Sequence, residues 1–337
     1  MARLVLIVTA LGLLVLLAGI GVTLKWQRQM QQPLNITAES TRYHLKSGTP
    51  VRLLARDLAD KEIIASAWAF EWSARRRQLT GKLQAGEYEI SKALTGEQLL
   101  QRFVLGEIYL NSFTIVEGWT YIRLLEELKQ APGISQHLAE DLSGQALMSA
   151  LGFPGIHPEG RFLPETYRYP TGTAAVQFLK RAAQALADEL AHIWAQRDED
   201  LPINSADEAL ILASIIERET AVVEERTQIA GVLIRRLKTG MRLQVDPTVI
   251  YGLGDKFDGN LTRRHLTTDT AYNTYTRAGL PPTPIALASR AAIEASVHPE
   301  AGDTFYYVSR GDGTHQFSVT YEQHLNAVKK YQLVKRP

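Results

Sequence analysis

The hydrophobic pattern begins with an uninterrupted apolar run at the N-terminus. Leu4 to Leu24 contain no charged residue, and at a rise of about 1.5 Å per residue this length matches the roughly 30 Å hydrocarbon core of a bilayer. We therefore predict a transmembrane helix, with residues 1–25 forming a cytoplasmic tip and an anchor. The alternative is a cleaved signal peptide, but its apolar part is usually only about 7–15 residues long and ends at an A-x-A-like site, which Ala18-Gly19-Ile20-Gly21 matches poorly.

Charge does not decide the orientation of this helix. Arg3 precedes the apolar run, whereas Lys25 and Arg28 follow it, so neither side has a clear excess. The short N-terminal tail has no room for a domain, and all of the chemistry must follow Leu24. We hypothesise that this larger part lies outside the cytoplasm. Residues 26–41 are polar and without apolar periodicity, and we predict a linker there.

Helical and alternating patterns over residues 42–110 predict a small α/β module. Its strand, helix, helix, strand, helix order is typical of modules that bind glycans, although a purely structural domain explains the order equally well. Trp68 and Trp72 lie one helical turn apart, and for this pair we favour packing over stacking on sugar rings. The expected elements are at residues 43–45, 51–58, 63–72, 86–90 and 95–106.

The remaining residues, 111–337, predict a mixed α/β domain, which makes the folded part of the chain α+β. Residues 159–167 combine glycine, proline, aromatic and carboxylate side chains, a composition typical of a shaped loop. We expect Glu159 and Glu165 in this loop to be surface carboxylates, as most glutamates are. The expected strands and helices include residues 112–116, 121–130, 304–310, 316–319 and 321–331.

A helix beginning after Ser205 carries the clearest chemical signal in the chain. Ser205 and Glu208 form a capping-box signature ahead of an apolar run. At about 100° per residue, Glu219 falls within an apolar stripe, whereas Glu217 falls on another side of the helix. The residues of this stripe nearest to Glu219 are Leu212, Ile216 and Val223.

Glu219 is therefore the candidate catalytic residue. Loss of hydration among apolar side chains raises the pKa of a carboxyl group, so that it can hold and donate a proton near neutral pH, as a glycosidic general acid must. The alternative is an ion pair with one of the arginines that follow, Arg226, Arg235 and Arg236. The carboxylates that we expect on solvated faces are Glu217, Glu224 and Glu225.

Composition excludes several other classes of function. The 37 lysines and arginines nearly cancel the 36 aspartates and glutamates, so the chain lacks the positive charge that a nucleic-acid partner requires. It contains no cysteine, which removes disulfides, thiolate metal sites and cysteine nucleophiles. Its eight histidines show no H-E-x-x-H spacing and no G-x-S-x-G elbow occurs, so a metal or serine hydrolase is a weak alternative. We expect no metal and no cofactor.

Four segments, taken together, closely resemble the endolytic murein transglycosylase family, also called YceG-like. They are E-R-E-T-A at 217–221, L-Q-V-D-P-T-V-I-Y-G at 243–252, Y-N-T-Y at 272–275 and G-L-P-P-T-P-I at 279–285. The resemblance covers essentially the whole chain, and it implies a LysM-like module at 42–110 followed by a catalytic domain at 111–337.

The resemblance also implies which residues form the site. In the family the catalytic acid is the second glutamate of the E-x-E-T motif, which here is Glu219 and agrees with its place in the apolar stripe. The other motif segments contain amides, carboxylates and tyrosines, which bind sugar hydroxyl and acetamido groups; ordinary turns are the alternative. The candidate substrate-binding residues are Gln244, Asp246, Tyr251, Asn273, Tyr275, Pro281 and Pro282.

The implied reaction is that of a carbon-oxygen lyase acting on the glycan strands of peptidoglycan. Glu219 protonates the oxygen between N-acetylmuramic acid and N-acetylglucosamine, then takes a proton from the C6 hydroxyl of the muramyl residue, which closes a 1,6-anhydro ring. One carboxylate suffices, because the nucleophile belongs to the substrate. The rival interpretation is a non-catalytic, membrane-anchored scaffold that binds peptidoglycan through the LysM-like module.

The resemblance further implies a cellular setting. The chain would be a single-pass protein of the inner (cytoplasmic) membrane, with its bulk on the periplasmic side, where it would terminate the elongation of nascent strands. Cell-wall synthases or division proteins are the further partners that such a role suggests.

Overall fold

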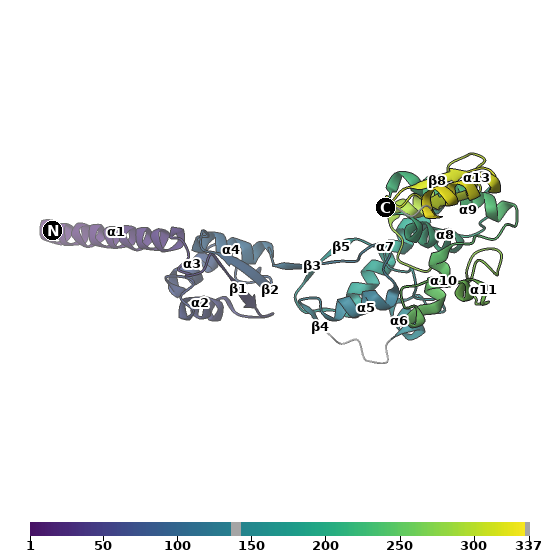
Figure 1. Ribbon diagram of the computed structural model, residues 1–337. Helices are drawn as coiled ribbons and strands as arrows, with labels where there is room; N and C mark the ends of the chain where they lie inside the picture. Colours follow the sequence, from purple (N-terminus) through teal and green to yellow (C-terminus); the bar gives the residue numbers. More distant parts are fainter. Residues whose placement is uncertain (136–142, 334–337) are drawn as a thin grey trace. The chain divides into compact units, whose positions relative to one another are not determined.

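The computed structural model describes residues 1–135 and 143–333 (Figure 1). The chain forms two compact units. Unit 1 comprises Met1–Asn111 and Tyr169–Thr171, and unit 2 comprises Ser112–Arg168 and Gly172–Pro337. Each unit has a hydrophobic core of its own.

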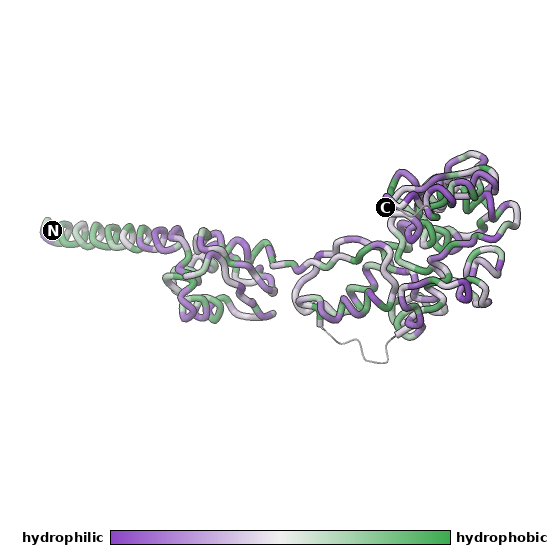
Figure 2. Tube along the Cα trace, in the orientation of Figure 1, coloured by the Kyte–Doolittle hydropathy of each residue, from purple (hydrophilic) through white to green (hydrophobic). Residues whose placement is uncertain are grey.

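The first element of unit 1, α1 (Ala2–Gln31), is a single helix of 30 residues. Its most apolar stretch has a mean hydropathy of 2.8 and is not buried against the rest of the protein, and Figure 2 shows this stretch as an almost continuous apolar rod. By length and composition α1 is able to cross a membrane. The prediction of a linker at residues 26–41 is partly wrong, because α1 continues to Gln31 and both Met30 and Leu34 are buried in the core of unit 1.

Two strands and three helices complete unit 1 in the predicted order. β1 (Ser40–Leu45) and β2 (Gly86–Ser91) pair antiparallel, and α2 (Val51–Asp60), α3 (Ala67–Arg76) and α4 (Gly96–Leu105) pack around them. The core that they share is built from large, fully buried side chains, which include Leu54, Phe70, Tyr88 and Phe103.

The ends of these helices follow their capping residues. The second predicted helix begins at Ala67 rather than Ile63, because the Ser66 side chain caps it and accepts a hydrogen bond from the Ala69 N–H at 3.3 Å. The third predicted helix, α4, has nearly the bounds that the sequence predicted. Thr95 forms a capping box at its start, and Gly106 ends it in the left-handed conformation.

Unit 2 is mainly helical, with short strand pairs at its margins. β3 pairs with β5, β4 runs parallel to β6, and β7 and β8 form an antiparallel hairpin. The strands β3 (Leu110–Thr114) and β5 (Thr166–Pro170) each extend across the boundary between the two units. The other elements, in chain order, are α5 (Tyr121–Lys129), β4 (Ile134–Ser135), α6 (Gly144–Leu151), β6 (Thr173–Ala174), α7 (Ala175–Ala195), α8 (Ala206–Glu219), α9 (Arg226–Lys238), α10 (Asp246–Leu253), α11 (Arg263–Thr267), α12 (Arg290–Val297), β7 (Tyr306–Ser309), β8 (His315–Ser318) and α13 (Tyr321–Val328), with short 3-10 turns at Val223–Glu225 and Gly254–Lys256 and a π turn at Lys329–Leu333.

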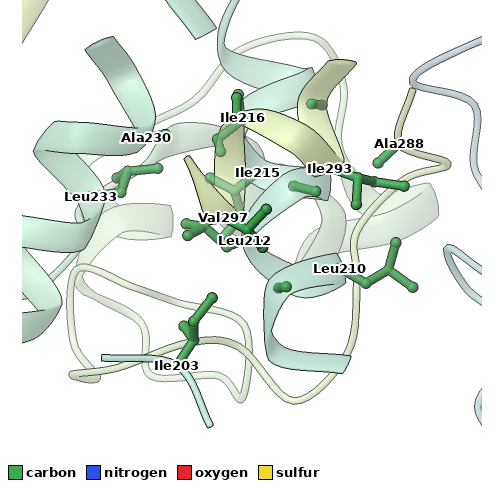
Figure 3. Close-up of a cluster of buried hydrophobic side chains, with 14 of the residues drawn as sticks. Ile203, Leu210, Leu212, Ile215, Ile216, Ala230, Leu233, Ala288, Ile293 and Val297 are labelled. Atoms are coloured by element: carbon green, nitrogen blue, oxygen red, sulfur yellow. The ribbon is translucent and has the colours of Figure 1, made fainter. Parts of the chain in front are cut away.

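The centre of unit 2 is α8, which packs against α7, α9 and α12. Every residue from Ala209 to Ile216 is buried, so this part of the helix is surrounded by protein on all sides. Figure 3 shows its side chains, such as Leu212 and Ile216, packed with Leu233 and Ile293 from neighbouring helices. The core thereby fixes the position of the C-terminal end of α8.

Two glycines provide a matched test of packing in unit 2. Gly160 and Gly152 both have positive φ, of 77° and 94°, but a Cβ on Gly160 would overlap Pro284, whereas a Cβ on Gly152 would meet open space. We expect Gly160→Ala to lower the free energy of unfolding by about 1–3 kcal/mol more than Gly152→Ala does, because only the first adds overpacking to backbone strain. Circular dichroism melts of the detergent-solubilised variants measure this, and equal losses would contradict the close contact with Pro284.

Candidate active site

α8 ends at Glu219, and the chain changes direction immediately after it. Thr220 is extended (φ −141°, ψ 137°) and buried, and its hydroxyl accepts a hydrogen bond from the Val222 N–H at 3.0 Å. The predicted stripe is right for Ile216, which is fully buried, but wrong for Val223, which follows the end of the helix and is 58% exposed. Glu219 is therefore the last helical residue, carried by a buried helix to the edge of the core.

Glu219 lines a cavity of about 610 Å³ in unit 2. The volume lies in the range of about 300–1,000 Å³ found for sites that hold small ligands. The walls come from the end of α8, the start of α10, the β7–β8 hairpin and α13. The polar side chains that line it with Glu219 include Arg236, Gln244, Asp246, Tyr275, Tyr307 and His315.

The surroundings of Glu219 favour its protonated form. Burial raises the pKa of its carboxyl group to about 7, and the negative charge of Asp246 acts in the same direction. A hydrogen bond from Tyr307 and the positive charge of Arg236 lower this pKa and offset part of the rise. The carboxyl group can therefore hold a proton near neutral pH and can also release it.

The arginines expected as alternative partners of Glu219 are engaged elsewhere. Arg226 pairs with Glu217 at 3.1 Å, and Arg235 donates to a backbone carbonyl at 2.7 Å. Arg236 is buried, and its guanidinium donates to two backbone carbonyls at 2.6 and 2.7 Å. Within the residues that the structure describes, Glu219 thus forms no salt bridge, and Arg236 influences it only through its field.

Three of the predicted substrate-binding residues lie in the same cavity as Glu219. Asp246 begins α10, and one of its carboxylate oxygens accepts a hydrogen bond from the Tyr275 hydroxyl at 2.5 Å. Gln244 precedes α10 with a positive φ of 50° and is exposed. The structure therefore brings Gln244, Asp246 and Tyr275 together with Glu219, although they are distant in sequence.

The other predicted residues do not line this cavity. The Tyr251 hydroxyl donates to Glu159 at 3.1 Å, and Asn273 is buried, with its amide donating to three backbone carbonyls. Pro281 is buried in the loop, and Pro282 is exposed outside the cavity. The polar groups of Tyr251 and Asn273 are thus used to hold the protein's own loops, which a motif alone does not reveal.

Glu159 is not the surface carboxylate that we expected. It is 2% exposed, and its oxygens accept hydrogen bonds from the Tyr121 N–H at 2.9 Å, the Gly160 N–H and the Tyr251 hydroxyl. Burial raises its pKa to about 7, although these bonds act in the opposite direction. Glu165, in the same loop, is exposed as predicted.

Tyr307 and His315, from the β7–β8 hairpin, also line the cavity, although we did not predict them as site residues. The Glu225 carboxylate bonds to the His315 ring at 2.7 Å and accepts a hydrogen bond from the His315 backbone N–H at 2.8 Å. The rings of His315 and Tyr307 pack edge to face, with their centroids 5.5 Å apart. Glu225 is therefore largely buried rather than solvated, with its side chain 12% exposed. The aromatic residues on both sides of the hairpin turn were the sequence feature that could have indicated a binding site there.

Glu217 is also buried, contrary to prediction. Its side chain is 5% exposed, pairs with Arg226 at 3.1 Å and accepts hydrogen bonds from the N–H and the hydroxyl of Ser289, the N-cap of α12. Glu217 lies on a face of α8 that the sequence pattern leaves to solvent, but α12 covers that face in the structure. Two glutamates only two residues apart therefore differ, since Glu217 forms a salt bridge, whereas Glu219 forms none with any residue that the structure describes.

This difference yields a stability test. We expect Glu217→Gln to lower the free energy of unfolding by about 3 kcal/mol, because it leaves the buried Arg226 with only the more distant Glu117 at 3.8 Å. The exposed Glu224 is the control, and Glu224→Gln should change stability by less than about 0.5 kcal/mol. Urea unfolding followed by tryptophan fluorescence measures both. Equal stability of the two variants would show that the pair with Arg226 does not stabilise the fold.

Comparison with known proteins gives one consistent result. The model of the YceG-like family matches residues 43–330. A Bacillus subtilis (strain 168) protein named endolytic murein transglycosylase is 27% identical, over 93% of this chain and 91% of that protein, and one of the same name from Streptococcus pneumoniae serotype 2 is 25% identical, over 84% and 57%. A crystal structure of a yceG-like protein from Listeria monocytogenes superposes with a TM-score of 0.54 at 27% identity, covering 86% of this chain and 98% of that one. The chain belongs to the YceG-like family.

Proposed function

We propose that the chain is an endolytic lytic transglycosylase of peptidoglycan, with Glu219 as its catalytic acid and base. The observation that carries the proposal is the carboxyl group of Glu219, which has a pKa of about 7, forms no salt bridge with the described residues and lies in a cavity large enough for sugar rings. The names of the Bacillus and Streptococcus relatives support the same reaction class. A non-catalytic scaffold would not need a proton-bearing carboxyl group in such a cavity.

The reaction needs one carboxyl group that first donates and then accepts a proton. Glu219 protonates the oxygen between N-acetylmuramic acid and N-acetylglucosamine, and positive charge develops at the anomeric carbon. The Glu219 carboxylate then takes the proton of the muramyl C6 hydroxyl, whose oxygen attacks that carbon and closes the 1,6-anhydro ring. The attacking hydroxyl is already part of the bound sugar, so no water has to be activated.

Side chains around Glu219 suit the binding of sugars. Gln244 and Asp246 offer amide and carboxylate groups for sugar hydroxyls. Aromatic rings form another wall, since Tyr306 lies 5.8 Å from Tyr321 and 5.3 Å from the ring of His324, measured between centroids. Such rings are suited to stacking on the apolar face of a sugar.

The setting of the enzyme follows from its substrate. Peptidoglycan lies outside the cytoplasmic membrane, so α1 would anchor the protein in that membrane with both folded units outside. Residues 42–110 would act as a LysM-like glycan-binding module and residues 111–337 as the catalytic domain. Cleavage close to the membrane surface would terminate nascent strands, near cell-wall synthases or division proteins.

The catalytic role of Glu219 is tested by Glu219→Gln, which keeps the shape of the side chain but cannot cycle a proton. We expect release of anhydro-muropeptides from purified sacculi to fall by about 10²–10⁴-fold, the usual contribution of general acid-base catalysis. Glu224→Gln is the matched control and should retain activity. The products are identified by mass spectrometry. Full activity of Glu219→Gln refutes the assignment of Glu219 as the catalytic residue. Products with reducing ends and no anhydro rings indicate a hydrolase, and the absence of any product from the unmodified protein indicates a scaffold.

The pH profile tests how Asp246 acts on Glu219. Bond cleavage requires protonated Glu219, so activity should fall as pH rises through its pKa of about 7. Asp246→Asn removes a negative charge that raises this pKa, and the alkaline fall in activity should therefore move to lower pH. Asp255→Asn, exposed and outside the cavity, should leave the profile in place. An alkaline limb that stays in place or moves to higher pH in Asp246→Asn would contradict the electrostatic coupling.

A further inference from the structure

An aromatic and cationic cluster joins α1 to α3 in unit 1. The rings of Trp26 and Trp72 meet edge to face with centroids 4.9 Å apart, and Trp68 stacks on Trp72 at 6.0 Å. The Arg76 guanidinium lies over the rings of Trp26 and Trp72, at 5.4 and 5.3 Å. The packing that we favoured for the tryptophan pair is present, but its partner is the N-terminal helix, and α3 lies beside the end of α1 (Figure 1).

The position of this cluster along α1 is defined by the apolar run. The run ends at Leu24, and Trp26 follows only two residues later, which is about 3 Å along a helix. The headgroup region on each side of a bilayer is about 5–8 Å thick. If α1 spans the membrane, Trp26 therefore lies in the headgroup region. Its ring contact with Trp72 brings Trp72 close to the same boundary, and Trp68 follows through its stacking on Trp72.

The exposed side of the cluster has the chemistry of a membrane-interface site. Trp68 is 49% exposed, and indole rings with one apolar and one polar edge are enriched at the level of lipid headgroups. Lys25 and Arg28 follow the apolar run on α1, and the charge of Glu71 is balanced by Arg75 at 2.7 Å. The excess of positive charge is suited to lipid phosphates.

We propose that α3 lies on the bilayer surface, with Trp68 inserted at the boundary between headgroups and acyl chains and with Arg76, Lys25 and Arg28 near lipid phosphates. Unit 1 is then a membrane-docked module rather than one that extends freely from its anchor. The inference rests on the proposed membrane span of α1 and not on catalysis by Glu219. A glycan-stacking role for Trp68 is the competing outcome.

The absence of cysteine from the chain allows a direct test by spin labelling. A nitroxide on Ala65→Cys, an exposed position three residues before Trp68 and just ahead of the Ser66 cap of α3, reports the depth of this end of α3 in nanodiscs that contain phosphatidylglycerol. Leu105→Cys is the control, because it is exposed on unit 1 at the far end of α4. We expect the label at 65 to collide more with oxygen than with a water-soluble nickel complex, and the label at 105 to show the reverse.

A second variant distinguishes insertion of Trp68 into the bilayer from mere closeness of α3 to the membrane. Trp68→Ala in the Ala65→Cys chain should shift the collision ratio at 65 towards that at 105. Equal nickel access at the two positions, an unchanged ratio in the Trp68→Ala chain, or failure of the chain to remain in the bilayer overturns the proposal. It is also overturned if chitooligosaccharides change the tryptophan fluorescence in nanodiscs and Trp68→Ala abolishes that response. None of these readouts depends on transglycosylase activity.

Discussion

The burial of α8 on all sides is the constraint on which the site depends. Because every residue from Ala209 to Ile216 is enclosed, the helix holds the Glu217 and Glu219 side chains in fixed places at the edge of the core, where their neighbours differ. Glu217 pairs with Arg226 and accepts a hydrogen bond from Ser289, whereas Glu219 forms no salt bridge with the described residues, and burial favours its protonated form. One helix therefore contributes a structural ion pair and a titratable acid within a single turn, and the difference comes from what packs against each side chain.

Opposing influences keep the Glu219 carboxyl group usable in both protonation states. Burial and Asp246 raise its pKa, while Tyr307 and Arg236 lower it. Burial alone would favour a group that rarely gives up its proton, and a close arginine would favour one that never holds it. Arg236 is kept from direct pairing because its guanidinium is bound to backbone carbonyls, so the acid-base balance depends on packing several residues away.

Local signals predicted much of this architecture, and long-range contacts account for the failures. The side chains of Thr95 and Ser205 cap the helices that begin directly after them, as their sequence signatures predicted. The apolar stripe correctly predicted that Ile216, one turn before Glu219, is buried. Glu217 was misjudged because its partners include Ser289, which lies far along the chain. His315 was missed for the same reason, since its place in the cavity follows from strand pairing and from Glu225.

A shifted pKa does not by itself identify a catalytic group, as the two carboxyls raised to about 7 show. Glu159 is enclosed, and its oxygens are used by Tyr121, Gly160 and Tyr251 to join the start of α5 to α10. A substrate cannot reach a proton held there. Glu219 has a similar proton affinity but faces a cavity, so access rather than acidity separates the group that can react from the one that holds the fold together.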